Sequence, residues 1–120
     1  MTFDPFDVVV VPFPFADLNE KKRRPALVVS SVSFNKVHKQ TIFAMITSTK
    51  NKWSSDVVIE DWQEAGLNVP CKIRLKLFTL DNKSVVRKVG KLSKRDEKSI
   101  VATLVDSLTT QQPLEDSDSA

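Results

Sequence analysis

The chain has 120 residues, of which 41% are apolar, 28% are charged and only two are glycine. This length accommodates one hydrophobic core but not two, and the composition is that of an ordinary globular domain. No stretch approaches the roughly 20 apolar residues of a membrane helix, the first residues lack the order of a signal peptide, and there is a single cysteine. We therefore expect one domain in the cytoplasm.

The formal net charge of +3 is unevenly distributed, because Glu115, Asp116 and Asp118 crowd the end of the chain. Setting these three acids aside raises the charge of the rest to +6. A basic body with an acidic tail suits a protein that binds a polyanion, although many soluble proteins without such a partner have a similar charge. We expect residues 1–108 to form the domain and residues 109–120 to form an acidic, disordered tail.

Two strands are predicted near the N-terminus. Residues Asp7 to Phe15 are β-branched and apolar and end with two prolines, which predicts a buried first strand. The polar, basic stretch from Ala16 to Arg24 is interpreted as a loop. Residues Ala26 to Ser31 are again rich in β-formers and predict the second strand.

The middle of the chain predicts shorter elements. A third strand is expected from Thr41 to Thr47, followed by a polar loop from Ser48 to Ser55 and a fourth strand from Val57 to Glu60. The segment from Asp61 to Leu67 has the pattern of one helical turn closed by glycine.

After Pro70 apolar and basic residues alternate, which predicts a strand with one core face and one basic face. The predicted core face carries Cys71, Ile73, Leu75 and Leu77, and the basic face carries Lys72, Arg74 and Lys76. Residues Val85 to Val89 are expected to form a last short strand.

The C-terminal helix has the clearest local signal. Ser93 with Asp96 three residues later forms a capping box. Apolar residues follow at helical spacing, namely Ile100, Val101, Leu104, Val105 and Leu108. Short strands with one terminal helix predict a mainly β fold, a small twisted antiparallel barrel or sheet with the helix packed on it.

Several kinds of catalytic chemistry are disfavoured. One histidine, one cysteine and no carboxylates at ligand spacing argue against a metal site and against Ser-His-Asp or Cys-His catalysis. The two glycines stand far apart, so there is no phosphate-binding glycine loop. We expect no cofactor and no metal, and interpret His38 as a loop residue.

Arginines, lysines and hydroxyls at strand ends could instead hold a phosphodiester. RNA carries its own nucleophile, the 2′-hydroxyl, so a protein can cleave it without metal by positioning that group and neutralising the phosphorane. Arg24 can engage two phosphate oxygens, and Pro25 fixes the backbone after it. Thr47, at a strand end, could reach the same phosphate. A solvated loop arginine and a strand-terminating threonine are the alternatives.

Six segments in order and spacing resemble the MazF/PemK-like toxins of type II toxin-antitoxin systems. The likeness covers residues 6 to about 108, and the segments are Asp7 to Phe15, Arg24 to Ser30, Ile46-Thr47-Ser48, Ala65-Gly66-Leu67, Phe78-Thr79-Leu80-Asp81 and Gly90-Lys91-Leu92-Ser93. The resemblance implies a Kid/MazF/CcdB-like fold, an SH3-like twisted antiparallel barrel with a C-terminal α-helix. It also implies a homodimer and a cognate antitoxin as protein partner.

The resemblance further implies a sequence-specific endoribonuclease, an mRNA interferase, with Arg24 and Thr47 as the catalytic pair. Single-stranded mRNA would be cut without metal to give 2′,3′-cyclic phosphate and 5′-hydroxyl ends. A guanidinium is a poor proton acceptor at neutral pH, so Arg24 is assigned electrostatic and acid roles.

Other residues receive supporting roles. Asp7 could orient the catalytic arginine or cap its own strand, and Trp53 could stack on a base or anchor its loop. Trp62 and Cys71 are interpreted as core residues. Contacts to the RNA backbone are expected from Lys21, Lys22, Arg23, Lys50, Lys52, Arg74 and Lys76.

The chain departs from the family pattern at two places. Phe6 stands where these toxins usually carry glycine, which leaves the backbone conformation there open. Leu75 and Lys76 stand where some members carry an acid. Two other functions therefore stay in consideration, a gyrase-binding poison resembling CcdB and a non-catalytic RNA-binding module.

Overall fold

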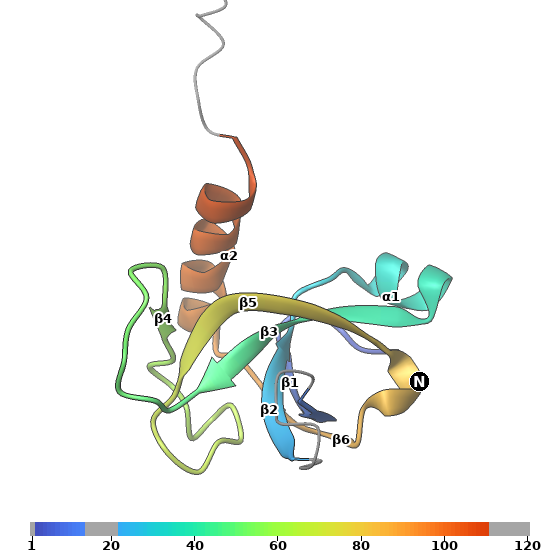
Figure 1. Ribbon diagram of the computed structural model, residues 1–120, viewed down its shortest axis with the longest axis horizontal. Coiled ribbons are helices and arrows are strands. Elements are labelled where there is room, and N and C mark those ends of the chain that lie inside the picture. Colours follow the sequence, from blue (N-terminus) through green and yellow to red (C-terminus); the bar gives the residue numbers. More distant parts are fainter. Residues whose placement is uncertain (1, 14–21, 111–120) are drawn as a thin grey trace, which may run out of the picture.

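The computed structural model describes residues 2–13 and 22–110, and its sheet is a curled half-barrel (Figure 1). All strand pairs are antiparallel, in the order β4-β5-β3-β2-β1-β6. The strands are β1 (Asp7–Pro12), β2 (Arg23–Val28), β3 (Gln40–Thr47), β4 (Val57–Val58), β5 (Lys72–Asp81) and β6 (Arg87–Lys91), and the helices are α1 (Val32–His38), a 3-10 turn η1 (Asn82–Ser84) and α2 (Lys94–Leu108). The predicted mainly β fold with a C-terminal helix is confirmed.

The first hairpin differs from its prediction at both strands. β1 ends at Pro12 rather than Phe15, and β2 begins at Arg23, so Arg24 is a strand residue opposite Val11 rather than a loop residue. The β2–β3 ladder starts at Ala26, so Pro25, which has no N–H to donate, lies where that ladder has ended. Residues 16–21 of the predicted loop, which include Lys21, lie outside the described residues, as does the tail beyond residue 110.

Two further predictions about local structure were wrong. β4 has two residues rather than four, and His38 ends helix α1, which was not predicted. This helix has an ordinary N-cap, because the Ser31 side chain accepts a hydrogen bond from the Phe34 amide at 3.1 Å. Its one buried side chain is the polar Asn35, which donates to the Phe3 carbonyl at 2.8 Å. The sequence of α1 therefore lacks the buried apolar stripe from which a helix is usually predicted.

Phe6 takes the backbone conformation that glycine would take at its position. Its φ is +72°, in the left-handed region that costs a non-glycine residue free energy. The Phe6 amide donates to the Val28 carbonyl at 2.7 Å, and its carbonyl accepts from the Leu92 amide at 3.0 Å. The turn that leads into β1 therefore has a left-handed backbone at a phenylalanine, held by hydrogen bonds on both sides.

The sheet buries apolar side chains on both faces. One cluster includes Val8, Leu27 and Ile73, and α2 packs on it through Ile100 and Leu104. The other cluster lies on the opposite face and includes Val9 and Phe43. The predicted helix α2 is confirmed with Ser93 as its N-cap, but Val101, Val105 and Leu108 remain 43–56% exposed. Neither α-helix in the described part of the chain is long and apolar enough to cross a membrane.

A bulge lies within β5, and the alternation seen in the sequence continues through it. Ala44 faces Leu77 while the next residue, Met45, faces Arg74, so Leu75 and Lys76 are extra residues on β5. A bulge bends its strand, and β5 arches over the sheet in Figure 1. The predicted core face is confirmed, because Ile73 lies in the first cluster and Cys71, Leu75 and Leu77 pack against it, whereas Arg74 of the predicted basic face is buried.

Both glycines of the chain lie at one point of contact between two backbones. A Cβ atom on Gly90 would lie 2.2 Å from the Ala65 carbonyl oxygen, and one on Gly66 would lie 2.2 Å from the Val89 carbonyl oxygen. Gly66 also has a φ of +87°. The loop from Asp61 to Leu67 is therefore held against β6 at a distance that only glycine permits.

We expect Gly90→Ala to lower the free energy of unfolding by about 1–3 kcal/mol, because the added methyl overlaps backbone atoms that cannot turn away. Urea unfolding monitored by circular dichroism measures this. Ala102→Ser adds one atom to an exposed position of α2 and should change stability by less than about 0.5 kcal/mol. Equal stability of Gly90→Ala and the parent would contradict the close packing.

Candidate active site

One cleft of about 400 Å³ lies where the ends of four strands meet the segment that follows Gly66. Its volume falls in the range of small-molecule sites, roughly 300–1,000 Å³. The lining residues are Val10, Arg23, Arg24, Pro25, Ile46, Thr47, Ser48, Gly66, Leu67, Asn68, Val69, Cys71, Arg87 and Val89. The lining thus combines apolar side chains with several polar and basic ones, the composition of a binding site.

Arg24 and Thr47, the predicted catalytic pair, both line this cleft. Ala26 of β2 faces Met45 of β3, and continuing this antiparallel register by two residues places Arg24 opposite Thr47. The Thr47 hydroxyl oxygen accepts a hydrogen bond from the Thr49 amide at 3.2 Å, which leaves its own hydrogen able to donate. The Arg24 guanidinium carbon lies 5.6 Å from the centre of the Phe13 ring, a cation–π distance.

Arg87 is a third arginine at the cleft that sequence reasoning did not select. Val10 of β1 pairs with Pro25 on one side and with Arg87 on the other, so β6 brings Arg87 to the same strand ends as Arg24. Only the pairing of β1 with β6, which are about 75 residues apart, reveals this, and no local motif signals it.

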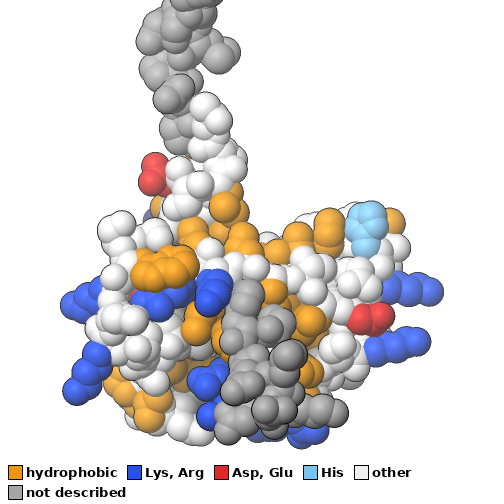
Figure 2. Space-filling view, viewed as in Figure 1, with side chains coloured by type: hydrophobic (Ala, Val, Ile, Leu, Met, Phe, Trp, Pro, Cys, Tyr) orange, Lys and Arg blue, Asp and Glu red, His pale blue; other side chains and the backbone are white. Residues whose placement is uncertain are grey.

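The charge at the cleft favours an anion. Within residues 2–13 and 22–110, no carboxylate lies at salt-bridge distance from Arg23, Arg24 or Arg87. Figure 2 shows Lys and Arg side chains spread over the lower half of the face viewed, where Asp and Glu side chains are few. A phosphate group would therefore be attracted to these side chains and would meet several donors.

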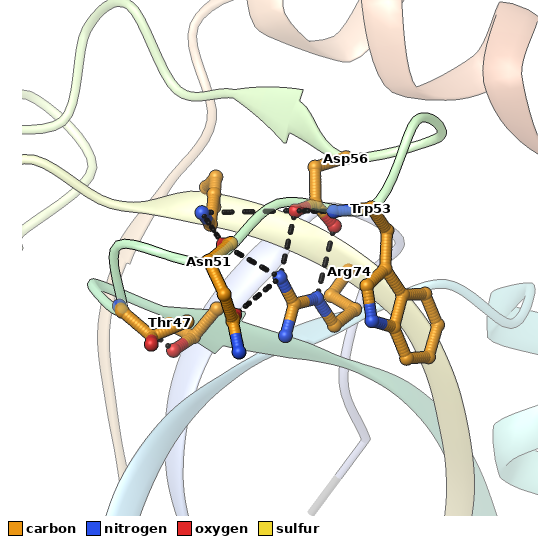
Figure 3. Close-up of polar contacts among 7 residues, drawn as sticks. Thr47, Asn51, Trp53, Asp56 and Arg74 are labelled. Atoms are coloured by element: carbon orange, nitrogen blue, oxygen red, sulfur yellow. Dashed lines mark hydrogen bonds and ion pairs between the residues drawn. The ribbon is translucent and has the colours of Figure 1, made fainter.

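The loop between β3 and β4 is fixed by cations of β5 (Figure 3). Arg74 donates from Nε to Asp56 Oδ1 at 3.0 Å and from Nη2 to Asp56 Oδ2 at 2.8 Å, and Nη2 also reaches the Asn51 carbonyl at 3.1 Å. Lys72 adds an ion pair to Asp56 at 3.7 Å. The Arg74 side chain holds the pKa of Asp56 below its usual range, chiefly by this hydrogen bonding.

These contacts change the roles expected for two residues. The guanidinium of Arg74 is engaged by Asp56 and Asn51, so Arg74 anchors the loop instead of offering a charge to RNA. Trp53 stacks on Arg74, with the guanidinium carbon 4.8 Å from the ring centre, and is still 45% exposed. This contact agrees with the alternative in which Trp53 anchors its loop, and part of the indole ring remains accessible to solvent.

The remaining predicted backbone contacts are spread over the surface. Lys22 and Lys76 are exposed, on the approach to β2 and in the β5 bulge, and Lys50 and Lys52 are exposed in the loop after Thr47. None of these four lysines lines the cleft. His38 is exposed at the end of α1, where its ring lies 4.6 Å from that of Phe34.

Asp7 lies at the far end of β1 from the residues that line the cleft. It faces Lys91, whereas Arg24 faces Val11, four residues further along β1. The buried Asp7 carboxylate accepts from the Asp4 amide at 2.9 Å and pairs with Lys88 at 3.1 Å. Of the two roles considered for Asp7, the contacts favour capping its own strand.

The loop that leads into the cleft-lining segment from Gly66 to Val69 is clamped by the start of α2. The buried Asp96 carboxylate accepts from the amides of Glu60 at 3.0 Å and Asp61 at 2.9 Å. Arg95 donates to both oxygens of Asp61 at 2.8 Å, and the Ser93 hydroxyl donates to Asp61 at 2.6 Å. The hydrogen bonds from Arg95 and Ser93 lower the pKa of Asp61 to about 2.

Cys71 and Trp62 are partly buried against the first apolar cluster, as expected of core residues. Cys71 also lines the cleft, and its thiol donates to the Val69 carbonyl at 3.3 Å. Burial raises the pKa of this thiol above its usual value. Among the described residues, no three His, Cys, Asp or Glu side chains are grouped so that they could hold a metal ion.

Residues 4–108 match the family model described as PemK-like, MazF-like toxin of type II toxin-antitoxin system. The chain belongs to this family. The match spans most of the sequence and includes the strand ends at the cleft, so the MazF/PemK resemblance inferred from six segments is confirmed. Among curated proteins, none matches this sequence.

Solved MazF structures share the fold at low sequence identity. An endoribonuclease from Mycobacterial species, solved in complex with its cognate antitoxin, has a TM-score of 0.71 at 13% identity, covering 93% of this chain and 98% of its own. MazF from Deinococcus radiodurans has a TM-score of 0.69 at 22% identity, covering 90% and 97%. The Mycobacterium tuberculosis toxin MazF-mt6 has a TM-score of 0.66 at 18% identity, covering 85% and 95%.

We expect Asp61→Asn to destabilise this MazF-like domain at neutral pH but not near pH 2. The folded pKa of Asp61, about 2, is below its ordinary value of 3.8, so its ionised form stabilises the fold above about pH 4. That contribution is lost as the pH falls toward 2. Urea unfolding of both proteins between pH 2 and 7 measures the difference in free energy.

Asp106→Asn serves as the control for this experiment, because Asp106 is an exposed carboxylate on α2. The free energy of unfolding of Asp106→Asn should equal that of the parent at every pH. The free energies of unfolding of Asp61→Asn and the parent could also differ by the same amount from pH 7 down to pH 2. That result would show that the ionised carboxylate does not hold the loop.

Proposed function

We propose that this chain is a sequence-specific, metal-independent endoribonuclease that acts as the toxin of a type II toxin-antitoxin system. The observation that carries the proposal is that Arg24 and Thr47 line one cleft from adjacent strand ends. Membership of the MazF/PemK family supports the same reaction class. Single-stranded RNA fits such a site, because its phosphates and unstacked bases are both accessible.

The proposed reaction uses the nucleophile that RNA supplies. The 2′-hydroxyl loses its proton and its oxygen bonds to the adjacent phosphorus, giving a phosphorane. The bond from phosphorus to the 5′-oxygen then breaks, and that oxygen takes up a proton, leaving 2′,3′-cyclic phosphate and 5′-hydroxyl ends. Arg24 neutralises the phosphorane and assists protonation of the leaving group, and Thr47 donates a hydrogen bond to a phosphate oxygen.

Other cations would hold the RNA on either side of the reacting phosphate. Arg23 and Arg87 flank Arg24 at the cleft, and exposed lysines lie at Lys22, Lys50 and Lys52. Such contacts position the strand and contribute most of the salt-sensitive affinity. Trp53, which is partly exposed beside this region, could stack on a base further along the strand.

Protein partners are also part of the proposal. A cognate antitoxin would lay an acidic segment along the basic rim of the cleft and exclude RNA. A second copy of the chain would cover the exposed apolar stripe of α2, formed by Val101, Val105 and Leu108. Sedimentation equilibrium should give twice the mass of the chain, and a monomer at all concentrations would overturn the homodimer.

We expect Arg24→Ala and Thr47→Val to lower the rate of RNA cleavage in EDTA by on the order of 10²-fold each, because each removes a donor to the phosphorane. Valine keeps the branched shape of threonine, so β3 should retain its fold. Single-turnover cleavage of a mixed-sequence transcript, with the new ends mapped by sequencing, measures the rate and the products. Lys98→Ala on α2, an exposed cation outside the cleft, should cut as fast as the parent.

If Arg24→Ala cleaves RNA as fast as the parent, the proposed active site is wrong. A parent that leaves RNA intact in EDTA but binds it tightly would instead favour the non-catalytic RNA-binding module. Growth arrest that depends on gyrase and survives both substitutions would favour the CcdB-like poison.

We expect Arg87→Ala to weaken binding of single-stranded RNA with little dependence on its sequence. One lost phosphate contact should make the slope of log K against log salt concentration less steep by about 0.7. Fluorescence anisotropy of a 2′-deoxy-substituted, uncleavable oligonucleotide at several salt concentrations measures this slope. An unchanged slope would place Arg87 outside the RNA path.

A further inference from the structure

The loop from Ser48 to Asp56 begins and ends beside the same strand. Thr47, the last residue of β3, lies opposite Lys72 of β5. Val57, the first residue of β4, lies opposite Ile73, the next residue of β5. The backbone of β5 thus places both ends of the loop, and side chains of the same strand hold its middle.

Two cations of β5 hold the middle of this loop (Figure 3). The Asn51 carbonyl accepts from Arg74 Nη2 at 3.1 Å and from Lys72 Nζ. The Asp56 carboxylate accepts from Arg74 Nε at 3.0 Å and Nη2 at 2.8 Å, and also from the Trp53 amide at 2.9 Å. One guanidinium therefore joins the middle of the loop to its end, which its planar set of donors allows and a single ammonium does not.

The pair of Arg74 and Asp56 is enclosed by protein. Their side chains are only 7% and 6% exposed. Desolvation offsets most of the stability that such a pair could add, whereas its hydrogen bonds fix the direction between the strand and the loop. The main effect expected of the pair is therefore on the geometry of the loop.

That geometry reaches the hydroxyl of Thr47. The Thr49 amide donates to Thr47 Oγ1 at 3.2 Å, and Thr47 itself lines the cleft. Thr49 stands two residues before Asn51, so the place of its amide depends on where the Asn51 carbonyl is held. Because the amide donates to one lone pair of the oxygen, it favours one orientation of the Thr47 side chain. The loop thus connects Arg74 on β5 to a hydroxyl at the cleft.

We propose that Arg74 is a positioning residue that acts through the loop from Ser48 to Asp56 and sets the orientation of the Thr47 hydroxyl at the cleft. The inference rests on the proposed ribonuclease function, in which Thr47 donates to a phosphate oxygen, and adds the residue that prepares this donor. Such a residue affects the rate without touching RNA, because a displacement of about 1 Å can lower a rate by on the order of 100-fold.

The first test is single-turnover cleavage at saturating RNA by Arg74→Lys. Lysine keeps the charge but cannot bind Asp56 and Asn51 together, so the rate should fall by on the order of 10-fold while the affinity for an uncleavable 2′-deoxy oligonucleotide stays that of the parent. A phosphate contact made by residue 74 would survive this exchange. Lys98→Arg, at an exposed position of α2 outside the cleft, is the matched control and should cut as fast as the parent.

The same exchange in the Thr47→Val background shows whether Arg74 acts through Thr47. It should have little effect there, because the hydroxyl that it misplaces is absent. A loss of equal size in both backgrounds would overturn the proposal. So would an Arg74→Lys variant that cuts as fast as the parent.

Asp56→Asn tests the same contact from the side of the loop. Asparagine has nearly the same size and removes the charge, so it weakens the hydrogen bonds from Arg74 without emptying space. Its loss of rate should likewise disappear in the Thr47→Val background. Circular dichroism identifies any variant that does not fold, and the comparison then uses the other variant of the pair.

A readout without cleavage is the exchange of the Thr49 amide with water, measured by NMR. Arg74→Lys should speed this exchange by on the order of 5-fold, because the released loop opens more often. In Thr47→Val the amide has lost its acceptor, and its exchange should be fast with either residue at position 74.

The two proposals fail in different ways. Unchanged exchange of Thr49 in Arg74→Lys would overturn the role of Arg74, and cleavage by the parent would leave the ribonuclease function standing. A parent that never cleaves, but in which the exchange of Thr49 depends on Arg74, would keep the link between Arg74 and Thr47 and overturn the proposed reaction.

Discussion

The contact between the backbones at Gly66 and Gly90 is the constraint on which the cleft depends. It brings the loop from Asp61 to Leu67 against β6, and this loop leads directly into the cleft-lining segment from Gly66 to Val69. β6 also carries Arg87, so the same contact fixes one cation relative to that segment. A side chain at either glycine would push the loop away from β6, because the atoms it would meet belong to backbone.

The start of α2 reinforces this contact from the other side of the loop. The buried Asp96 carboxylate accepts hydrogen bonds from two loop amides, and Arg95 pairs with Asp61. The helix thus covers an apolar cluster through Ile100 and positions the loop through its first turn. A second clamp, between Arg74 and Asp56, fixes the loop that follows Thr47. The strand ends that carry Arg24 and Thr47 are therefore followed or faced by two loops held by ion pairs with good geometry.

Local patterns predicted much of the fold, because β-branched runs and the capping box at Ser93 are set by neighbouring residues. The same patterns placed Thr47 at a strand end but Arg24 in a loop, and they could not show that the two residues line one cleft. Helix α1 escaped prediction because it buries an asparagine instead of an apolar stripe. Arg74 was misassigned because its burial depends on contacts with Asn51, Trp53 and Asp56 of another loop. Arg87 was missed because its place depends on the pairing of β1 with β6.

The central claim is that Arg24 and Thr47 act on one phosphate, and a double-mutant cycle on single-turnover cleavage tests it most directly. Residues that stabilise the same transition state lose activity non-additively. The account predicts that Arg24→Ala combined with Thr47→Val cuts little more slowly than the slower single variant. A combined loss equal to the product of the two separate losses would show that the residues act independently and would contradict the shared site.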